Sequence, residues 1–169
     1  MNTPSDTATI DVNDQLTSVF LGKYRELLEG MPTGEPTWVT SGGPEGGVYG
    51  TLADVTAEEA SRDLGGTSIA AHAEHLRWAI DLVNDYFAGK EPTSDWSESW
   101  LVKRVDETAW TALKEALRSA GDRLLAAVPT QHSWHEEFAV NGALASYGHT
   151  AYHLGALRQL KKRVREGTA

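Results

Sequence analysis

Histidine is the residue type in this sequence with the greatest potential for chemistry, because the chain has six histidines and no cysteine. His149 and His153 are four residues apart, so on a helix they lie only ~40° apart around the axis and face one direction. His72 and His75 are three residues apart in a second predicted helix, on adjoining faces of one turn. A single histidine on an apolar face is most often a hydrogen-bonded core residue, but two such pairs favour a shared divalent cation.

Periodicity alone leaves open which histidine of the first pair would be a ligand. His72 lies closer than His75 to the apolar line formed by Ile69, Leu76 and Val83. Both residues therefore stay candidates at this point.

The surroundings of the histidines supply few other reactive groups. The absence of cysteine excludes disulfides, thiolate metal ligands and a protein thiol nucleophile. No general base is recognisable, since Glu74 points ~100° away from its neighbour His75 around the helix. Glu136 and Glu137, just before the last predicted helix, are the other candidates. The last two histidines, His132 and His135, lie in a polar stretch and are interpreted as solvated surface residues.

Four segments must position these residues, and each shows the apolar period of an amphipathic helix. We expect helices over Val12–Glu29, from Thr67 or Ser68 to Gly89, over Trp110–Val128 before Pro129, and from between Phe138 and Gly142 to beyond Leu160. With no convincing alternating strand, the fold class is all-α, a four-helix bundle.

Two long connections join the predicted helices, well above the ~2–8 residues typical of bundles, so they should cross over the bundle or wall a site. The first, Met31–Gly66, is rich in glycine and proline, and Thr56 and Glu59 have capping-box spacing that predicts a short helix over Ala57–Asp63. Four aromatic residues of the connections either line a pocket mouth or, as is more common, pack over bundle ends: Trp38, Tyr49, Trp96 and Trp100.

Length and composition narrow the class of protein. At 169 residues we expect a single domain over residues 1–169, with residues 1–10 flexible. The formal charge of −9 disfavours nucleic acid as a partner, and no apolar run or leader-like start indicates a membrane protein, so a cytoplasmic location is expected and a homodimer is left open. The basic cluster at 158–165 is interpreted as helix-end charge that offsets the macrodipole.

Two motifs resemble the DinB-like family of helical bundle proteins, which includes the YfiT-type metal hydrolases and bacterial thiol-dependent transferases and isomerases. One is Thr67-Ser68-Ile69 followed by His75-Leu76, and the other is His149 through Gly155. The resemblance covers nearly the whole chain in order of elements. It implies that His75, His149 and His153 are the metal ligands, with His75 preferred over His72 on family spacing. The chain departs from the family at Ala156, where a glutamine is common.

Two functions are compatible with such a site, and the resemblance implies the first of them. Three protein ligands leave a coordination position open, as in catalytic zinc sites, so one reading is a metal-dependent hydrolase or a transferase that uses a low-molecular-weight thiol. The alternative is a non-catalytic binding or structural bundle stabilised by the metal. All-imidazole ligation favours zinc or nickel. The partner would be a small-molecule substrate or thiol.

Overall fold

The computed structural model of the chain describes residues 11–130 and 137–167. In this part of the chain every regular element is helical, which confirms the all-α class. The predicted count of four describes only the long helices, because two shorter α-helices and three 3-10 turns accompany them. The elements are α1 (Val12–Glu29), η1 (Pro44–Gly46), α2 (Val48–Ala53), α3 (Ala57–Ala60), α4 (Ile69–Phe87), η2 (Glu98–Trp100), α5 (Glu107–Ala127), η3 (Val128–Thr130) and α6 (Glu137–Glu166).

The expected flexibility of residues 1–10 and the expected exposure of His132 and His135 lie outside the described residues.

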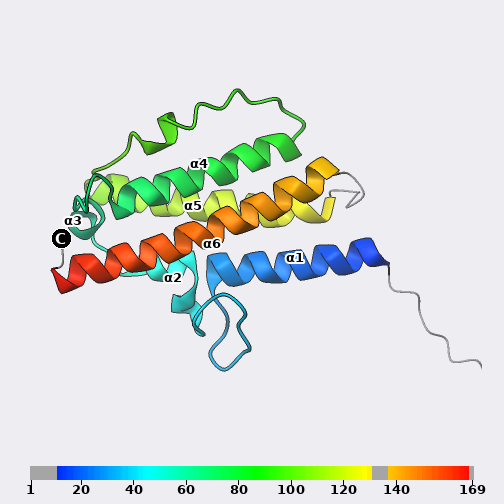
Figure 1. The fold of residues 1–169 in the computed structure, drawn as a ribbon, viewed down its shortest axis with the longest axis horizontal. Coiled ribbons are helices and arrows are strands. Elements are labelled where there is room, and N and C mark those ends of the chain that lie inside the picture. The colour runs from blue at the N-terminus through cyan, green and yellow to red at the C-terminus, as the bar shows by residue number, and fades with distance from the viewer. Residues whose placement is uncertain (1–10, 131–136, 168–169) are drawn as a thin grey trace, which may run out of the picture.

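The four long helices surround one apolar core (Figure 1). Helix α4 packs against both α5 and α6, and α1 contacts the same two helices from the other side. Trp110 of α5 is a fully buried member of this core, and its indole N–H donates to the carbonyl of Val55 at 2.7 Å. A buried indole with a satisfied N–H stabilises the core without leaving a polar atom unpaired.

Two hydrogen bonds show the relative directions of the long helices. Ser68 at the start of α4 donates from Oγ to the carbonyl of Lys103, just before α5, at 2.8 Å. Arg62, which precedes α4, donates from Nη1 to the carbonyl of Val164 near the end of α6, at 2.9 Å. Helix α5 is therefore parallel to α4, and α6 is antiparallel to it. Residues 88–106 return along α4 as the expected crossover, drawn in green in Figure 1.

Side chains cap the starts of α1, α3, α4 and α5, and the sequence predicted the caps of α3 and α4. Ser68 Oγ accepts from the backbone N–H of Ala71 at 3.1 Å, which identifies Ser68 rather than Thr67 as the N-cap of α4. Thr56 and Glu59 form the predicted capping box of α3. Helix α5 begins three residues earlier than its apolar stripe because Asp106 caps it.

The first long connection contains a helix that the sequence did not predict. Helix α2 lies in a glycine-rich stretch interpreted as loop, where Gly47 and Gly50 weaken the helical signal. Both glycines are needed for close packing, since a Cβ on Gly47 would lie 2.2 Å from the backbone nitrogen of Gly30 and one on Gly50 2.2 Å from the carbonyl oxygen of Pro44. Burial of Val48 and Leu52 outweighs the poor local propensity.

A buried carboxylate anchors the same connection to α1. Glu26 is 1% exposed, and its Oε1 accepts backbone N–H groups of Trp38, Val39 and Thr40 at 2.8, 2.7 and 3.0 Å. Burial by itself would raise the pKa of Glu26, but these N–H groups and the charge of Lys23 outweigh it and lower the pKa to about 2.

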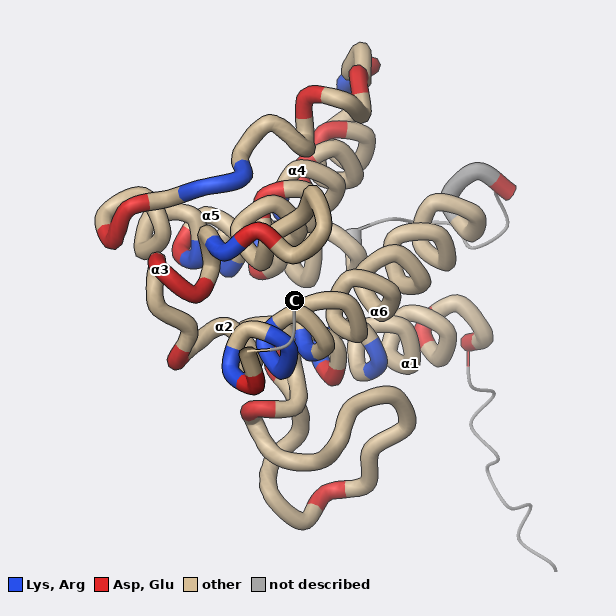
Figure 2. Tube along the Cα trace, turned by 60° about the vertical axis from the view of Figure 1, so that its left-hand side comes forward, with Lys and Arg blue, Asp and Glu red and all other residues tan. Residues whose placement is uncertain are grey.

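Charged residues gather around α2 and the end of α6 (Figure 2). Asp54 pairs with Lys161 at 2.5 Å and with Arg165 at 3.0 Å, and Arg165 also pairs with Glu59 at 3.0 Å. Lys161 and Arg165 of the basic cluster therefore form specific ion pairs with carboxylates of the first long connection.

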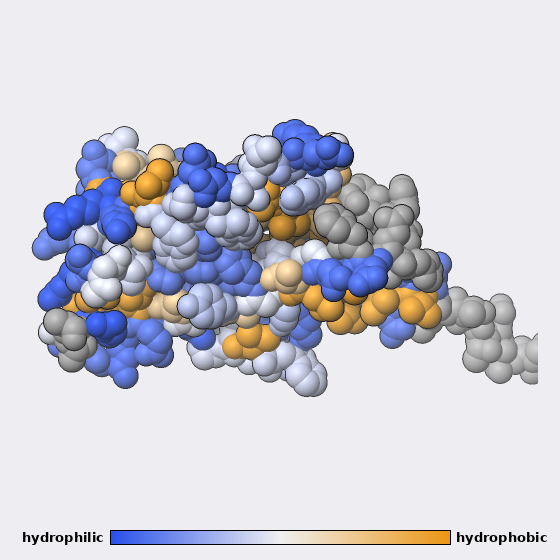
Figure 3. Space-filling view, turned by 45° about the horizontal axis from the view of Figure 1, so that its top comes forward, coloured by the Kyte–Doolittle hydropathy of each residue, from blue (hydrophilic) through white to orange (hydrophobic). Residues whose placement is uncertain are grey.

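The first half of α1 is less buried than its apolar period implies. Val12, Leu16 and Val19 are 64%, 45% and 54% exposed, and Figure 3 shows apolar surface toward the end of the molecule where α1 begins. Among the described helices, none has the length and apolar content required to cross a lipid bilayer.

Candidate metal centre

Helices α4 and α6 bring three histidines together near the middle of their shared interface. One ring nitrogen each from His75, His149 and His153 lies within 4.8 Å of the other two. Nε2 of His75 and Nε2 of His149 are 3.0 Å apart. Two nitrogens bound tetrahedrally at ~2.0–2.1 Å from one ion would be about 3.3 Å apart, so this pair needs little movement to share a cation.

The antiparallel packing of α4 and α6 explains the pairing. Since one helix ascends as the other descends, His75 lies opposite His149, and His72, nearly one turn earlier, lies opposite His153. His72 packs at 2.9 Å from His153 through the Nδ1 atoms, but it is not one of the three side chains that converge. Of the two candidates in α4, His75 is therefore the one whose ring converges with both His149 and His153.

Ser99 determines which ring nitrogen of His75 carries the proton. Its Oγ lies 2.6 Å from the carbonyl oxygen of Trp96, which can only accept, so the hydroxyl proton points there. The same Oγ lies 2.6 Å from Nδ1 of His75 and must accept from that ring. The His75 proton is therefore on Nδ1, and Nε2 has its lone pair directed at His149.

Burial keeps the histidine cluster neutral. Desolvation, reinforced by the neighbouring imidazoles, lowers the pKa of His75 to about 4 and that of His153 to about 3. Desolvation also lowers the pKa values of His72 and His149. Neutral imidazoles are the form that binds a metal, so these side chains would not have to lose a proton near neutral pH in order to bind one.

The crossover between α4 and α5 covers the cluster with aromatic rings. Trp100 in η2 stacks on His75 with ring centroids 4.0 Å apart and an interplanar angle of 19°. The ring centroid of Trp96 lies 5.7 Å from that of His75 and 5.9 Å from that of His149. These two tryptophans thus wall the site, the less common of the two explanations that the sequence left for connection aromatics.

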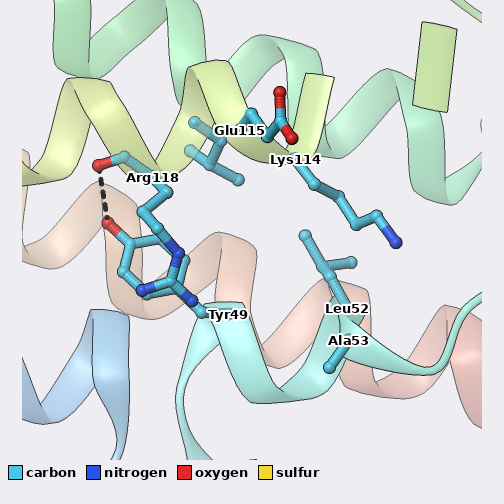
Figure 4. Close-up of a pocket in the computed structure, with 7 residues that line it drawn as sticks. Tyr49, Leu52, Ala53, Lys114, Glu115 and Arg118 are labelled. Carbon is cyan, nitrogen blue, oxygen red and sulfur yellow. Dashed lines mark hydrogen bonds between the residues drawn. The ribbon is translucent and has the colours of Figure 1, made fainter. Parts of the chain in front are cut away.

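Trp38 and Tyr49 lie elsewhere. Trp38 is 80% exposed with Lys23 over its ring. Tyr49 lines a pocket of about 220 Å³ between α2 and α5 that has no histidine in its lining (Figure 4). Its hydroxyl donates to the carbonyl of Arg118 at 3.3 Å, and the guanidinium of Arg118 stacks over the ring.

The carboxylates considered as bases do not join the cluster. Glu74 accepts two hydrogen bonds from Arg77 at 2.6 and 2.8 Å, consistent with its predicted direction away from the site. Glu137 is exposed at the start of α6, twelve residues and so about 18 Å of helix before His149. Glu136 lies outside the described residues. Of the His, Asp and Glu side chains that the structure describes, only the three histidines gather at metal-binding distances.

Ser99 is the residue of this site that sequence reasoning missed. It is fully buried, yet it lies in a short 3-10 turn with no helical or strand period around it. The only signal was its place between Trp96 and Trp100, and a serine between two tryptophans has no specific meaning by itself.

The fold and the site together define an all-α protein with a trihistidine cluster between two antiparallel helices. The chain belongs to the DinB superfamily, whose model matches residues 20–156 and so includes all three histidines of the cluster. The resemblance noted in the sequence is confirmed at the level of the family. A comparison with curated proteins finds no match, and neither does a comparison with solved structures.

Proposed function

We propose that this chain binds one divalent transition metal ion on His75, His149 and His153. The observation that carries the proposal is the convergence of three neutral imidazoles, one of which has its Nε2 lone pair fixed toward the others. Zinc or nickel suits an all-imidazole set better than calcium or magnesium, which prefer oxygen ligands.

We further propose that the centre is catalytic, in a metal-dependent hydrolase or a small-thiol transferase. Three protein ligands match the pattern of catalytic rather than structural zinc sites. When bound, the ion supplies an open position at which a water molecule or a thiol becomes more acidic. Because the chain has no cysteine, the thiol would be a small cofactor.

Each residue around the cluster has a distinct role in the proposed centre. The three histidines hold the ion, and Ser99 keeps the lone pair of His75 in place. Trp96 and Trp100 exclude bulk water from one side of the cluster, which strengthens electrostatic interactions within it. Tyr152 is 68% exposed, and its ring centroid lies 5.0 Å from that of His153.

Elemental analysis of purified protein tests the metal site. We expect one zinc or nickel per wild-type chain and loss of that metal in His149→Ala, with helix content nearly unchanged because the apolar core is intact. Glu74→Gln, next to a ligand on α4 but paired with Arg77, is the matched control and should keep full metal content. Equal metal in the two variants would contradict the proposed ligand set.

Cobalt substitution tests catalysis against the non-catalytic alternative. Titration with low-molecular-weight thiols should change the visible ligand-field spectrum if the open position accepts a thiolate. A spectrum indifferent to every thiol would remove the transferase class. Failure also to turn over ester, amide and phosphoester substrates would leave a metal-stabilised bundle.

A further inference from the structure

His72 is a buried histidine that the proposed ligand set does not use. Its side chain is 8% exposed and lies between His153 of α6 and Trp100 of the crossover. The ring centroids of His72 and Trp100 are 5.2 Å apart, and the two ring planes are nearly perpendicular, at 87°. Its Nδ1 is 2.9 Å from Nδ1 of His153, within hydrogen-bonding distance. In a hydrogen bond between these two Nδ1 atoms, one ring carries the proton and donates it, and the other ring accepts it with its lone pair.

Only two arrangements of that proton are available to two neutral rings. If His72 donates, the Nδ1 lone pair of His153 is occupied and the proton of His153 must be on Nε2, so that ring has no lone pair left for a metal. If His153 donates, its Nε2 is unprotonated and free to bind. The second arrangement is the only one in which His153 serves as a ligand without breaking the hydrogen bond.

We propose that His72 is a positioning residue that accepts the Nδ1 proton of His153 and so holds the Nε2 lone pair of His153 ready for a metal. The inference rests on the proposed metal site for its purpose. It has an independent parallel in the same cluster, where Ser99 Oγ accepts the Nδ1 proton of His75. Both buried ligands would then be oriented through Nδ1, one by the crossover and one by α4 itself.

Nitrogen-15 NMR of the metal-free protein tests the proton position directly. We expect His153 to have its proton on Nδ1 and His72 to have its proton on Nε2. In His72→Leu, which removes the acceptor, His153 should shift toward the Nε2-protonated form. In His72→Asn, whose amide oxygen takes the place of Nδ1, the wild-type form should return. A wild-type His153 protonated on Nε2 overturns the inference, whether or not the protein binds metal.

Metal competition with a chelator gives the second readout. His72→Leu should weaken zinc affinity by about 10–100-fold, the usual loss on removing a partner of a metal-bound histidine, and His72→Asn should restore most of it. Thr150→Val is the matched control, because it removes a buried hydroxyl of α6 that bonds Tyr24 and not an imidazole. Unchanged affinity in His72→Leu, or X-ray absorption showing one imidazole fewer around its zinc, contradicts a positioning role. A wild-type protein that binds neither zinc nor nickel refutes the proposed function, and the NMR experiment on the metal-free protein still tests which nitrogen of His153 carries the proton.

Discussion

Replacing Ser99 by alanine should weaken metal binding more than its loss of stability explains. Ser99 is 0% exposed and links the carbonyl of Trp96 to Nδ1 of His75, which is itself 4% exposed. Without the hydroxyl, the ring N–H has no acceptor at this position, and an unsatisfied buried group costs about 1–3 kcal/mol. His75 also becomes free to move its proton to Nε2, the atom that would bind the ion. We expect metal affinity to fall by about 10–100-fold, equivalent to about 1.4–2.8 kcal/mol.

Denaturant unfolding with and without zinc separates the two effects. At a free zinc concentration far above both dissociation constants, Ser99→Ala should lose about 1.4–2.8 kcal/mol more in the zinc-loaded protein than in the metal-free protein. Ser97→Ala is the control, since Ser97 lies two residues away and is exposed, and its hydroxyl bonds Asp95 and not an imidazole. An equal loss of stability in the two states would show that Ser99 only stabilises the fold and does not hold the proton of His75 on Nδ1 for metal binding.

Three further predictions concern pH and packing. Because unfolded histidines protonate near pH 6.5 and folded His75 and His153 only near pH 4 and 3, the free energy of unfolding of the metal-free protein should fall as the pH drops from about 6.5 toward 3. The lowering of the pKa of Glu26 from 4.5 to about 2 corresponds to about 3 kcal/mol, so Glu26→Gln should lower the free energy of unfolding at neutral pH by about that amount. Wild-type protein should lose this stability as the pH falls from 4.5 to about 2, whereas the variant should not, and urea unfolding measures both effects. Gly47→Ala should destabilise by at least about 1–3 kcal/mol through overpacking, whereas Gly22→Ala, with nothing within 4 Å of the new Cβ, should be neutral or stabilising in thermal unfolding.

The long helices could be predicted because their local signals agree with one another. Helix α1 has the predicted bounds, and Ser68 was one of two predicted caps for α4. Helix α2 could not be predicted, since it packs closely against the end of α1 at Gly47 and against η1 at Gly50, and glycine locally opposes a helix. The exposure of Val12 and Val19 could not be predicted either, because a helical period identifies an apolar face without specifying what covers it.

The candidate site was predictable in residue type but not in detail. Spacing placed His149 and His153 on one face, yet the choice between His72 and His75 needed the register of α6 against α4, which a single sequence does not contain. Family spacing favoured His75, and the geometry brings that residue to the other two. The role of Ser99 depends on the path of a crossover whose residues have no periodic pattern.

The topology of the bundle and the construction of the site follow from the same connection. Helix α4 has 19 residues and is therefore about 28 Å long, and α5 must start beside the first turn of α4, because Ser68 bonds Lys103. A chain that ends α4 at Phe87 has to travel back over that whole length, and the route passes His75 on its way. Residues beyond the minimum needed to span the distance form the turn η2, which places a serine against a ring nitrogen and a tryptophan against a ring face. Shortening the crossover would therefore remove the orientation of His75 even if all four long helices still packed.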